Sequence, residues 1–174
     1  MFRFCPQCRS ELTIRRLGGL DRKACPSEQC DFVHWGNPTP VVAGIVERDG
    51  RVVLVQSHGW PEDWYGLVTG FLEPGEKPED AIVREVKEEI GINASLTSYL
   101  GAYPFEQINQ IIFAYHLVGE AGPITLCEHE LADHKEVTIE KLRPWSRGTG
   151  PAVRDWLASR GLHPSVIERT RSRD

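Results

Sequence analysis

Three glutamates in residues 70–92 have the chemical type and the spacing needed to bind a metal ion. Glu88 and Glu89 follow Glu85 by three and four residues, so a helix would place all three carboxylates on one face. Like charges at this spacing repel one another by roughly 0.2–0.5 kcal/mol per pair. A hard divalent cation with oxygen ligands offsets this repulsion, and Mg²⁺ is the natural candidate. The pattern therefore predicts a magnesium site on a helix.

The neighbouring residues predict the elements that position these carboxylates. Pro78 suits the first turn of a helix, and Gly91 is typical of its end. Before the helix, Gly70, Pro74 and Gly75 are typical of a tight loop whose backbone can approach a phosphate. We expect the loop and the helix to form one catalytic unit.

The same stretch carries the signature of a known family. It matches the Nudix box at Gly70, Glu76, Arg84, Glu85, Val86, Glu88, Glu89, Gly91 and Ile92. The chain therefore resembles the Nudix hydrolases, which cleave a nucleoside diphosphate linked to another group. The alternative, a solvated acidic helix with a capping loop, rarely reproduces nine fixed positions. The resemblance implies an α+β fold, an α-β-α sandwich with a mixed β-sheet between helices.

The resemblance also implies roles for the residues of the box. Glu85 and Glu89 would hold one or more Mg²⁺ or Mn²⁺ ions against the phosphate oxygens. Glu88 would supply the remaining ligand or activate water, and the identity of the general base stays open. Arg84 would orient the carboxylates by a bidentate ion pair, with Glu76 completing that support.

Four cysteines near the N-terminus form a second group of candidate ligands. Cys5 and Cys8 belong to the sequence CPQC, and Cys25 and Cys30 to CPSEQC. Zn²⁺ binds four soft ligands in a tetrahedron, which two thiolate-bearing turns can supply. A closed site of this kind stabilises a fold and leaves no position for substrate, so we expect a structural zinc ribbon. The alternative is a set of reduced or redox-active thiols.

The combination of the two motifs narrows the resemblance. A zinc ribbon joined to a Nudix domain is similar to the NADH pyrophosphatase branch, which carries an SQPWPFPxS signature after the box. This chain reads AYPFEQINQ at residues 102–110, with Pro104 kept and Phe105 in place of tryptophan. Those residues line the nucleotide site in that branch. The departure leaves the hydrolase assignment intact, but it weakens the case for NADH as the substrate.

One further metal-binding glutamate is expected after the box. Glu130, followed by Leu131, is similar in position to a metal-binding glutamate of that branch, on a loop facing the box helix. Glu128 is the rival candidate. The alternative for either residue is a surface acid in a polar loop.

Aromatic residues outside the helix are candidates for binding the substrate. Phe71, Phe105 and Trp64 could stack on an adenine or nicotinamide ring, although aromatics of the loop 59–66 could instead cover the edge of the core. We expect a compound of the NADH, FAD or ADP-ribose type to be hydrolysed to a mononucleotide. The alternatives are a nucleoside triphosphate and an NAD-capped RNA end.

A different class of function would make the Nudix domain a ligand sensor without turnover. Its ribbon would then bind nucleic acid or a protein, and the phosphate-contacting residues would be Arg9, Arg15, Arg16, Arg22 and Lys23. The box is intact, whereas sensors in the family typically carry a degraded one. Such charges also serve simply to keep a small module soluble.

Composition sets the remaining expectations. The net charge of −5 argues against general affinity for nucleic acid or an anionic membrane. The absence of an apolar run of signal-peptide or membrane-span length predicts a cytoplasmic protein. The sequence predicts a zinc ribbon over 1–36, a Nudix domain over 37–162 and a charged tail over 163–174. The resemblance implies a homodimer, although no sequence feature shows an interface.

Local patterns predict several elements of the Nudix domain. Residues 41–47 and 51–57 are strand-like and flank Asp49-Gly50, a strong hairpin signal. Residues 111–118 have the apolar density of a buried strand. Residues 151–160 predict an amphipathic helix.

Overall fold

The computed structural model describes residues 2–168 and divides the chain into two compact units, Met1–Pro38 and Thr39–Asp174. The first unit is a three-stranded antiparallel sheet of β1 (Thr13–Leu17), β2 (Leu20–Ala24) and β3 (Val33–His34), in that order. Gly18 and Gly19, with φ of 58° and 79°, connect the first two strands. A two-residue hairpin loop of this type needs positive φ at both positions, and glycine adopts it without strain.

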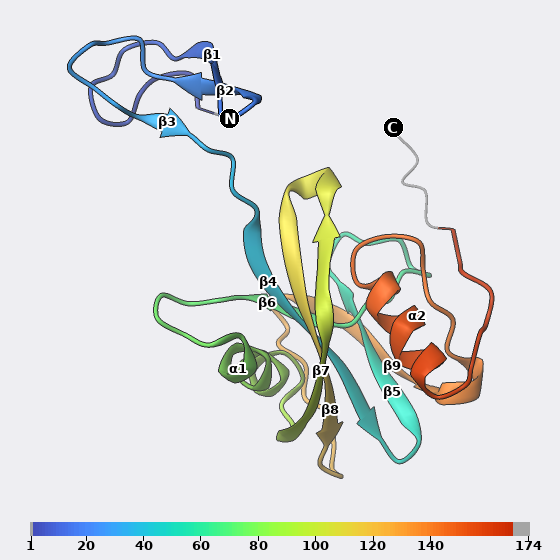
Figure 1. Ribbon diagram of the computed structural model, residues 1–174. Helices are drawn as coiled ribbons and strands as arrows, with labels where there is room; N and C mark the ends of the chain where they lie inside the picture. The colour runs from blue at the N-terminus through green and yellow to red at the C-terminus, as the bar shows by residue number, and fades with distance from the viewer. Residues whose placement is uncertain (1, 169–174) are drawn as a thin grey trace. The chain divides into compact units, whose positions relative to one another are not determined.

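The second unit is built on a six-stranded mixed sheet (Figure 1). Its strands are β4 (Thr39–Arg48), β5 (Arg51–Ser57), β6 (Val68–Phe71), β7 (Ala94–Phe105), β8 (Gln110–Gly119) and β9 (Leu131–Thr138). The order is β7-β8-β4-β5-β9, with β6 also paired to β4. Strands β4 and β8 run parallel, and the other pairs are antiparallel. Asp49 and Gly50 form the predicted hairpin turn, with φ of 48° and 69°.

One helix packs on each face of this sheet (Figure 1). Helix α1 (Pro78–Ile90) shares an apolar cluster with Val42 and Val46 of β4, whereas α2 (Gly150–Ser159) shares one with Ala43 and Ile45. Alternate residues of a strand point to opposite faces, so one strand serves both cores. The predicted α-β-α sandwich is confirmed. Short 3₁₀ turns, Glu106–Ile108 and Ile139–Lys141, follow β7 and β9.

Helix α1 begins and ends where the sequence predicts. Pro78 occupies its first turn, and the preceding N-cap residue, Lys77, makes no side-chain capping hydrogen bond. Gly91 ends the helix in the left-handed conformation, and its N–H donates to the carbonyl of Lys87 at 3.1 Å. The side chains of Ala81, Ile82, Val86 and Ile90 are buried. Each large aliphatic side chain buried in this way contributes roughly 1.5–3 kcal/mol.

The segment after the predicted Nudix domain is partly anchored to it. Ile167 forms a parallel bridge with Trp145, and the N–H of Ile167 donates to the carbonyl of Pro144 at 2.7 Å. Residues 169–174 of the predicted tail lie outside the described residues. Over residues 2–168, no helix combines the length and apolar character that crossing a membrane requires.

Candidate active site

The carboxylate of Glu85 lies directly against the backbone at the end of β6. A Cβ added at Gly70 would stand 1.9 Å from Cδ of Glu85, so the Glu85 side chain would have to move. Gly70 pairs with Val42 of β4, on the face of the sheet that α1 covers. The glycine of the box therefore permits the close approach of the Glu85 carboxylate to this strand.

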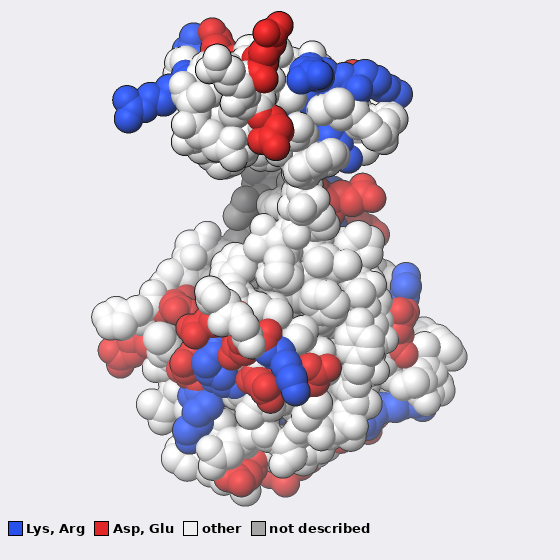
Figure 2. All heavy atoms as spheres, turned by 60° about the vertical axis from the view of Figure 1, so that its left-hand side comes forward, with Lys and Arg blue, Asp and Glu red and all other residues white. Residues whose placement is uncertain are grey.

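Arg84 binds three carboxylates at once. Its Nε and Nη2 donate to the two oxygens of Glu76 at 2.8 and 2.9 Å. Its Nη1 donates to Glu85 at 2.9 Å and to Glu88 at 2.8 Å, and Nη2 also donates to the carbonyl of Phe71 at 3.1 Å. The bonds from Arg84, with one from the N–H of Glu73, lower the pKa of Glu76 to about 2. This arginine fixes the orientation of the acidic cluster. Figure 2 shows acidic and basic side chains gathered side by side on one face of the second unit.

Glu89 is the most unusual acid of the cluster, because it is only 6% exposed and its Oε2 has no hydrogen-bond partner among the described residues. Burial, followed by the charges of Glu85 and Glu130, raises its pKa to about 8, although a bond from the N–H of Thr69 acts the other way. Burial also raises the pKa of Glu85. An unpaired buried carboxylate beside other acids fits a site that receives a cation.

A cavity of about 600 Å³ lies beside this cluster. Its polar lining includes Glu73, Arg84, Glu85, Glu88, Gln110 and Glu130. Phe71 lies at the same cavity and is 59% exposed, so much of its side chain is accessible to a ligand. The cavity is therefore lined both by acidic side chains and by an exposed aromatic ring.

Glu130 reaches the cavity because its loop is bonded to the end of α1. The N–H of Cys127 donates to the carbonyl of Glu89 at 2.9 Å, and the N–H of Glu130 donates to the carbonyl of Cys127 at 3.0 Å. Glu128 does not line the cavity; its carbonyl lies 2.9 Å from Nε2 of His58. Of the two candidates for the additional ligand, the geometry favours Glu130.

The donor set suits a hard cation, although it does not form a closed cage. In the described part of the chain, only the four cysteines bring three or more ligand atoms within 4.8 Å of one another. No choice of one oxygen from each of Glu85, Glu89 and Glu130 therefore brings all three within that distance of one another. Mg²⁺ usually keeps several waters and takes only one or two carboxylates directly, so an open acidic wall fits it.

The four cysteines form a compact group within the first unit. The Sγ atoms of Cys5 and Cys30 are 3.6 Å apart, and those of Cys8 and Cys25 are 3.3 Å apart. All four thiols are free, and Cys5 and Cys25 are buried. Four thiols gathered from two turns are the donor set of a structural zinc site.

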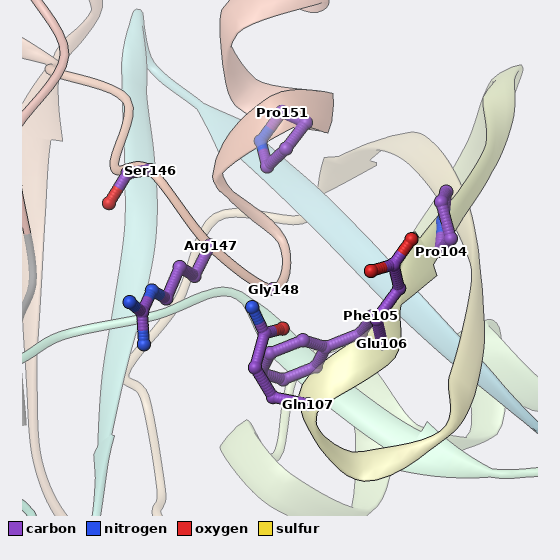
Figure 3. Close-up of a pocket in the computed structure, with 8 residues that line it drawn as sticks. All are labelled: Pro104, Phe105, Glu106, Gln107, Ser146, Arg147, Gly148 and Pro151. Carbon is purple, nitrogen blue, oxygen red and sulfur yellow. The ribbon is translucent and has the colours of Figure 1, made fainter.

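The two other predicted aromatic residues lie outside the large cavity. Phe105 lines a separate pocket of about 140 Å³, in which Figure 3 shows Phe105 and Gln107 on one side and Ser146 and Arg147 on the other. Trp64 lines neither pocket, and its carbonyl accepts a bond from Gln56 at 3.3 Å.

Gln110 is one of the cavity residues that sequence reasoning did not select, as are Glu73 and Thr69. It is the register partner of Phe105 in the β7–β8 pair, so it links the large cavity to the smaller pocket. It closes the stretch at residues 102–110 that departs from the family signature. Only its position at the start of β8 could have drawn attention to it.

Comparisons with known proteins agree with this architecture. The NUDIX domain family model matches residues 37–157. A chain described as a NUDIX hydrolase from Nitrosomonas europaea superposes with a TM-score of 0.74 over 96% of this chain and 97% of that one, at 22% identity. At this identity the likeness concerns the fold alone.

Two curated relatives are similar in sequence. The NAD-capped RNA hydrolase NudC of Vibrio vulnificus is 31% identical over 144 residues, covering 82% of this chain and 53% of the relative. The NAD-capped RNA hydrolase NudC of Pseudomonas putida strain W619 is 27% identical over 171 residues, covering 96% and 60%. This chain thus spans little more than half the length of these relatives. The family model matches most of the residues of this chain, and the fold agrees with it. The chain therefore belongs to the NUDIX domain family.

Proposed function

We propose that this protein is a Mg²⁺-dependent hydrolase that cleaves the pyrophosphate bond of a nucleoside diphosphate linked to another group, releasing a mononucleotide. The observation that carries the proposal is the buried Oε2 of Glu89, which has no partner among the described residues and stands beside an acidic cluster that Arg84 has already ordered. A purely structural acidic helix has no reason to bury a carboxylate unpaired.

The residues that would hold the cation are Glu85, Glu89 and Glu130. All three are coupled electrostatically, because the charges of Glu85 and Glu130 both raise the pKa of Glu89. When bound there, Mg²⁺ supplies charge neutralisation of the phosphate oxygens and lowers the pKa of water. Mn²⁺ would suit the same oxygen ligands.

The side chains of the protein orient the reactants and move one proton. Water attacks one phosphorus, the bond from that phosphorus to the bridging oxygen breaks, and the water proton passes to a carboxylate. Glu88 is our candidate for that base or for the remaining metal ligand, because it lines the cavity and is held at 2.8 Å by Arg84. Arg84 and Glu76 act as positioning residues.

Phe71 is the strongest candidate for binding the nucleotide base, because it lines the cavity and is largely exposed. Phe105 would contact a more distant part of the substrate. It does not line the large cavity, although its register partner Gln110 does. Trp64 lies outside both pockets, so its role stays a prediction.

The substrate class that we propose contains NADH, FAD, ADP-ribose and NAD-capped RNA ends. The first three follow from the expected chemistry, and the names of the two NudC relatives support the capped RNA. All four contain a pyrophosphate joined to a nucleoside, so one cleavage reaction serves them all.

The test is Mg²⁺-dependent hydrolysis of a panel that contains these compounds, a dinucleoside polyphosphate and nucleoside triphosphates. We expect turnover of at least one compound with a pyrophosphate-linked nucleoside. Glu89→Gln should lower kcat by about 10²–10³-fold, as expected when one electrostatic contact to the transition state is lost. Glu130→Gln should also lower the rate, and Glu128→Gln, outside the cavity, is its matched control. Absence of turnover for every compound would overturn the proposal.

A further inference from the structure

The first unit presents a basic and aromatic surface on one side of its sheet. Arg15 of β1 lies opposite Arg22 of β2 in the register, so their side chains share one face. The guanidinium carbon of Arg22 stands 4.9 Å from the centre of the Trp35 ring, which places Trp35 on the same face. We call these three residues the ribbon face.

The tryptophan of the ribbon face is exposed but held in place. Trp35 is 52% exposed, and its carbonyl accepts a hydrogen bond from Nη1 of Arg22. A cation over one side of an indole ring leaves the other side free for a planar ligand. A tryptophan fixed in this way loses little conformational freedom when a base stacks on it.

The cations of the ribbon face are not neutralised by nearby acids. Arg15 is exposed and makes no ion pair among the described residues. By alternation along the strands, Asp21 points to the opposite face, where it pairs with Arg16 at 3.2 Å. The ribbon face is therefore a net positive surface.

Charge is also unevenly divided between the two units. Residues 1–38 contain six Lys and Arg against four Asp and Glu, whereas residues 39–174 contain fourteen against twenty-one. A polyanion is therefore repelled by the second unit, which carries the whole acidic excess of side-chain charge.

We propose that the ribbon face binds single-stranded RNA, with a base stacked on Trp35 and phosphates bound by Arg15 and Arg22. A stacking platform flanked by arginines is the general means by which proteins hold single strands without reading their sequence. The inference goes beyond hydrolysis and rests on the proposed function only in its choice of RNA over DNA. A duplex should bind less well, because its bases are not free to stack.

The experiment is fluorescence anisotropy of a labelled, uncapped single-stranded 12-nucleotide RNA with the full chain, over a series of salt concentrations. Trp35→Ala should weaken binding by about five- to a hundredfold, the effect of losing one stacked base, and Trp35→Phe should largely restore it. Arg15→Gln should lower the slope of log affinity against log salt by about 0.7, as one phosphate contact is lost. Arg3→Gln, whose arginine pairs with Glu11 at 3.2 Å, is the matched control.

The inference is overturned if the RNA does not bind, if Trp35→Ala binds it as tightly as the wild type, or if a duplex of equal length binds equally well. The result of the RNA-binding test can be distinguished from the result of the hydrolysis test of the proposed function. Hydrolysis of small substrates without RNA binding refutes the ribbon face alone. RNA binding without turnover of any compound refutes only the hydrolase.

Discussion

Glu89 illustrates how a single residue can be unfavourable for folding and useful for function. It is buried without a partner for Oε2, its neighbours Glu85 and Glu130 are also acidic, and its pKa rises to about 8. In the absence of a cation these features cost stability, since an unsatisfied buried polar group costs about 1–3 kcal/mol. Glu76 shows the opposite effect, because hydrogen bonds from Arg84 lower the pKa of its carboxyl group to about 2.

Glu89→Gln should therefore separate metal binding from folding. Without divalent cations, the variant should unfold at a temperature no lower than the wild type, because an amide, unlike the carboxyl group, cannot ionise in this buried position. Added Mg²⁺ should raise the melting temperature of the wild type by mass action and leave the variant nearly unchanged. Differential scanning calorimetry with and without Mg²⁺ measures both effects. An equal Mg²⁺-induced increase in the two proteins would show that Glu89 is not a ligand.

At the scale of elements, the site depends on how closely β6 approaches α1. The strand provides Gly70 and the exposed Phe71, and the helix provides Arg84 and the acids. Arg84 also bonds to the carbonyl of Phe71 at 3.1 Å, so the two elements are joined at the cavity. The junction explains why the loop and the helix of the box behave as one unit.

Gly70→Ala should lower activity more than it lowers stability. Its Cβ would stand 1.9 Å from Cδ of Glu85, so that carboxylate must move away from its position on Arg84. We expect kcat to fall by about 10-fold or more, since misplacing a ligand or its support typically costs 10–100-fold. Gly44→Ala is the matched control, because its Cβ would meet core side chains of Leu117 and Ile82 at 2.9 and 3.0 Å. Gly70→Ala could instead lose no more activity, for a given loss of stability, than Gly44→Ala. That result would disprove the inference that Gly70 is needed to position the carboxylate of Glu85.

A second junction, between the sheet and the end of α2, should be sensitive to pH. Burial lowers the pKa of His116 below its ordinary 6.5, although Glu47, 2.9 Å from Nε2, opposes this effect. Arg160, which also pairs with Glu47, and the ring of Trp156 are the other groups that face it. The neutral imidazole, with its proton on Nε2, can donate to Glu47.

The sign of the pH effect follows from the lowered pKa of His116 in the folded protein. The unfolded chain binds the proton more tightly, so the free energy of unfolding decreases as the pH falls below about 6.5. His116→Gln should reduce the fall in melting temperature between about pH 7 and pH 5. The exposed His163, changed in the same way, serves as the control. An unchanged pH profile in His116→Gln would rule out this contribution.

At the scale of the whole molecule, the two units have separate means of stabilisation. The two apolar clusters that enclose the sheet of the second unit contain only residues from Val41 onwards. The first unit has instead four clustered thiols and a small sheet of three strands. A unit as small as the first one buries little apolar surface on folding. Metal binding commonly supplies the stability of such modules.

Removal of zinc should therefore affect the units differently. A chelator selective for Zn²⁺ over Mg²⁺ should increase amide hydrogen exchange in residues 2–38, because the thiols would lose the ion expected to hold the two turns together. Hydrolysis of small substrates should persist, since the cavity is lined by the second unit alone. Exchange measured by mass spectrometry, beside the Mg²⁺-dependent rate under the same conditions, tests this. Loss of all activity with an unchanged exchange pattern would contradict it.

Features that depend on local spacing could be predicted from the order of the residues alone. The ends of α1, the hairpin at Asp49 and Gly50, and the buried strand at 111–118 were predicted correctly, because caps, turn residues and apolar runs act over a few neighbouring positions. The Nudix fold was also predicted and is confirmed by the family match. The roles of the site residues and the domain limits stay predictions.

Only the tertiary structure decided which distant residues meet. Strands β7 and β9 were not predicted, because they lie at the edges of the sheet, where much of each strand is exposed and its apolar pattern is weak. Backbone bonds between Cys127 and Glu89 bring Glu130 into the cavity, and strand register places Phe105 beside Gln110. Backbone pairing over long sequence separations leaves little trace in residue type, so spacing alone could not show that Phe71 and Phe105 line different pockets.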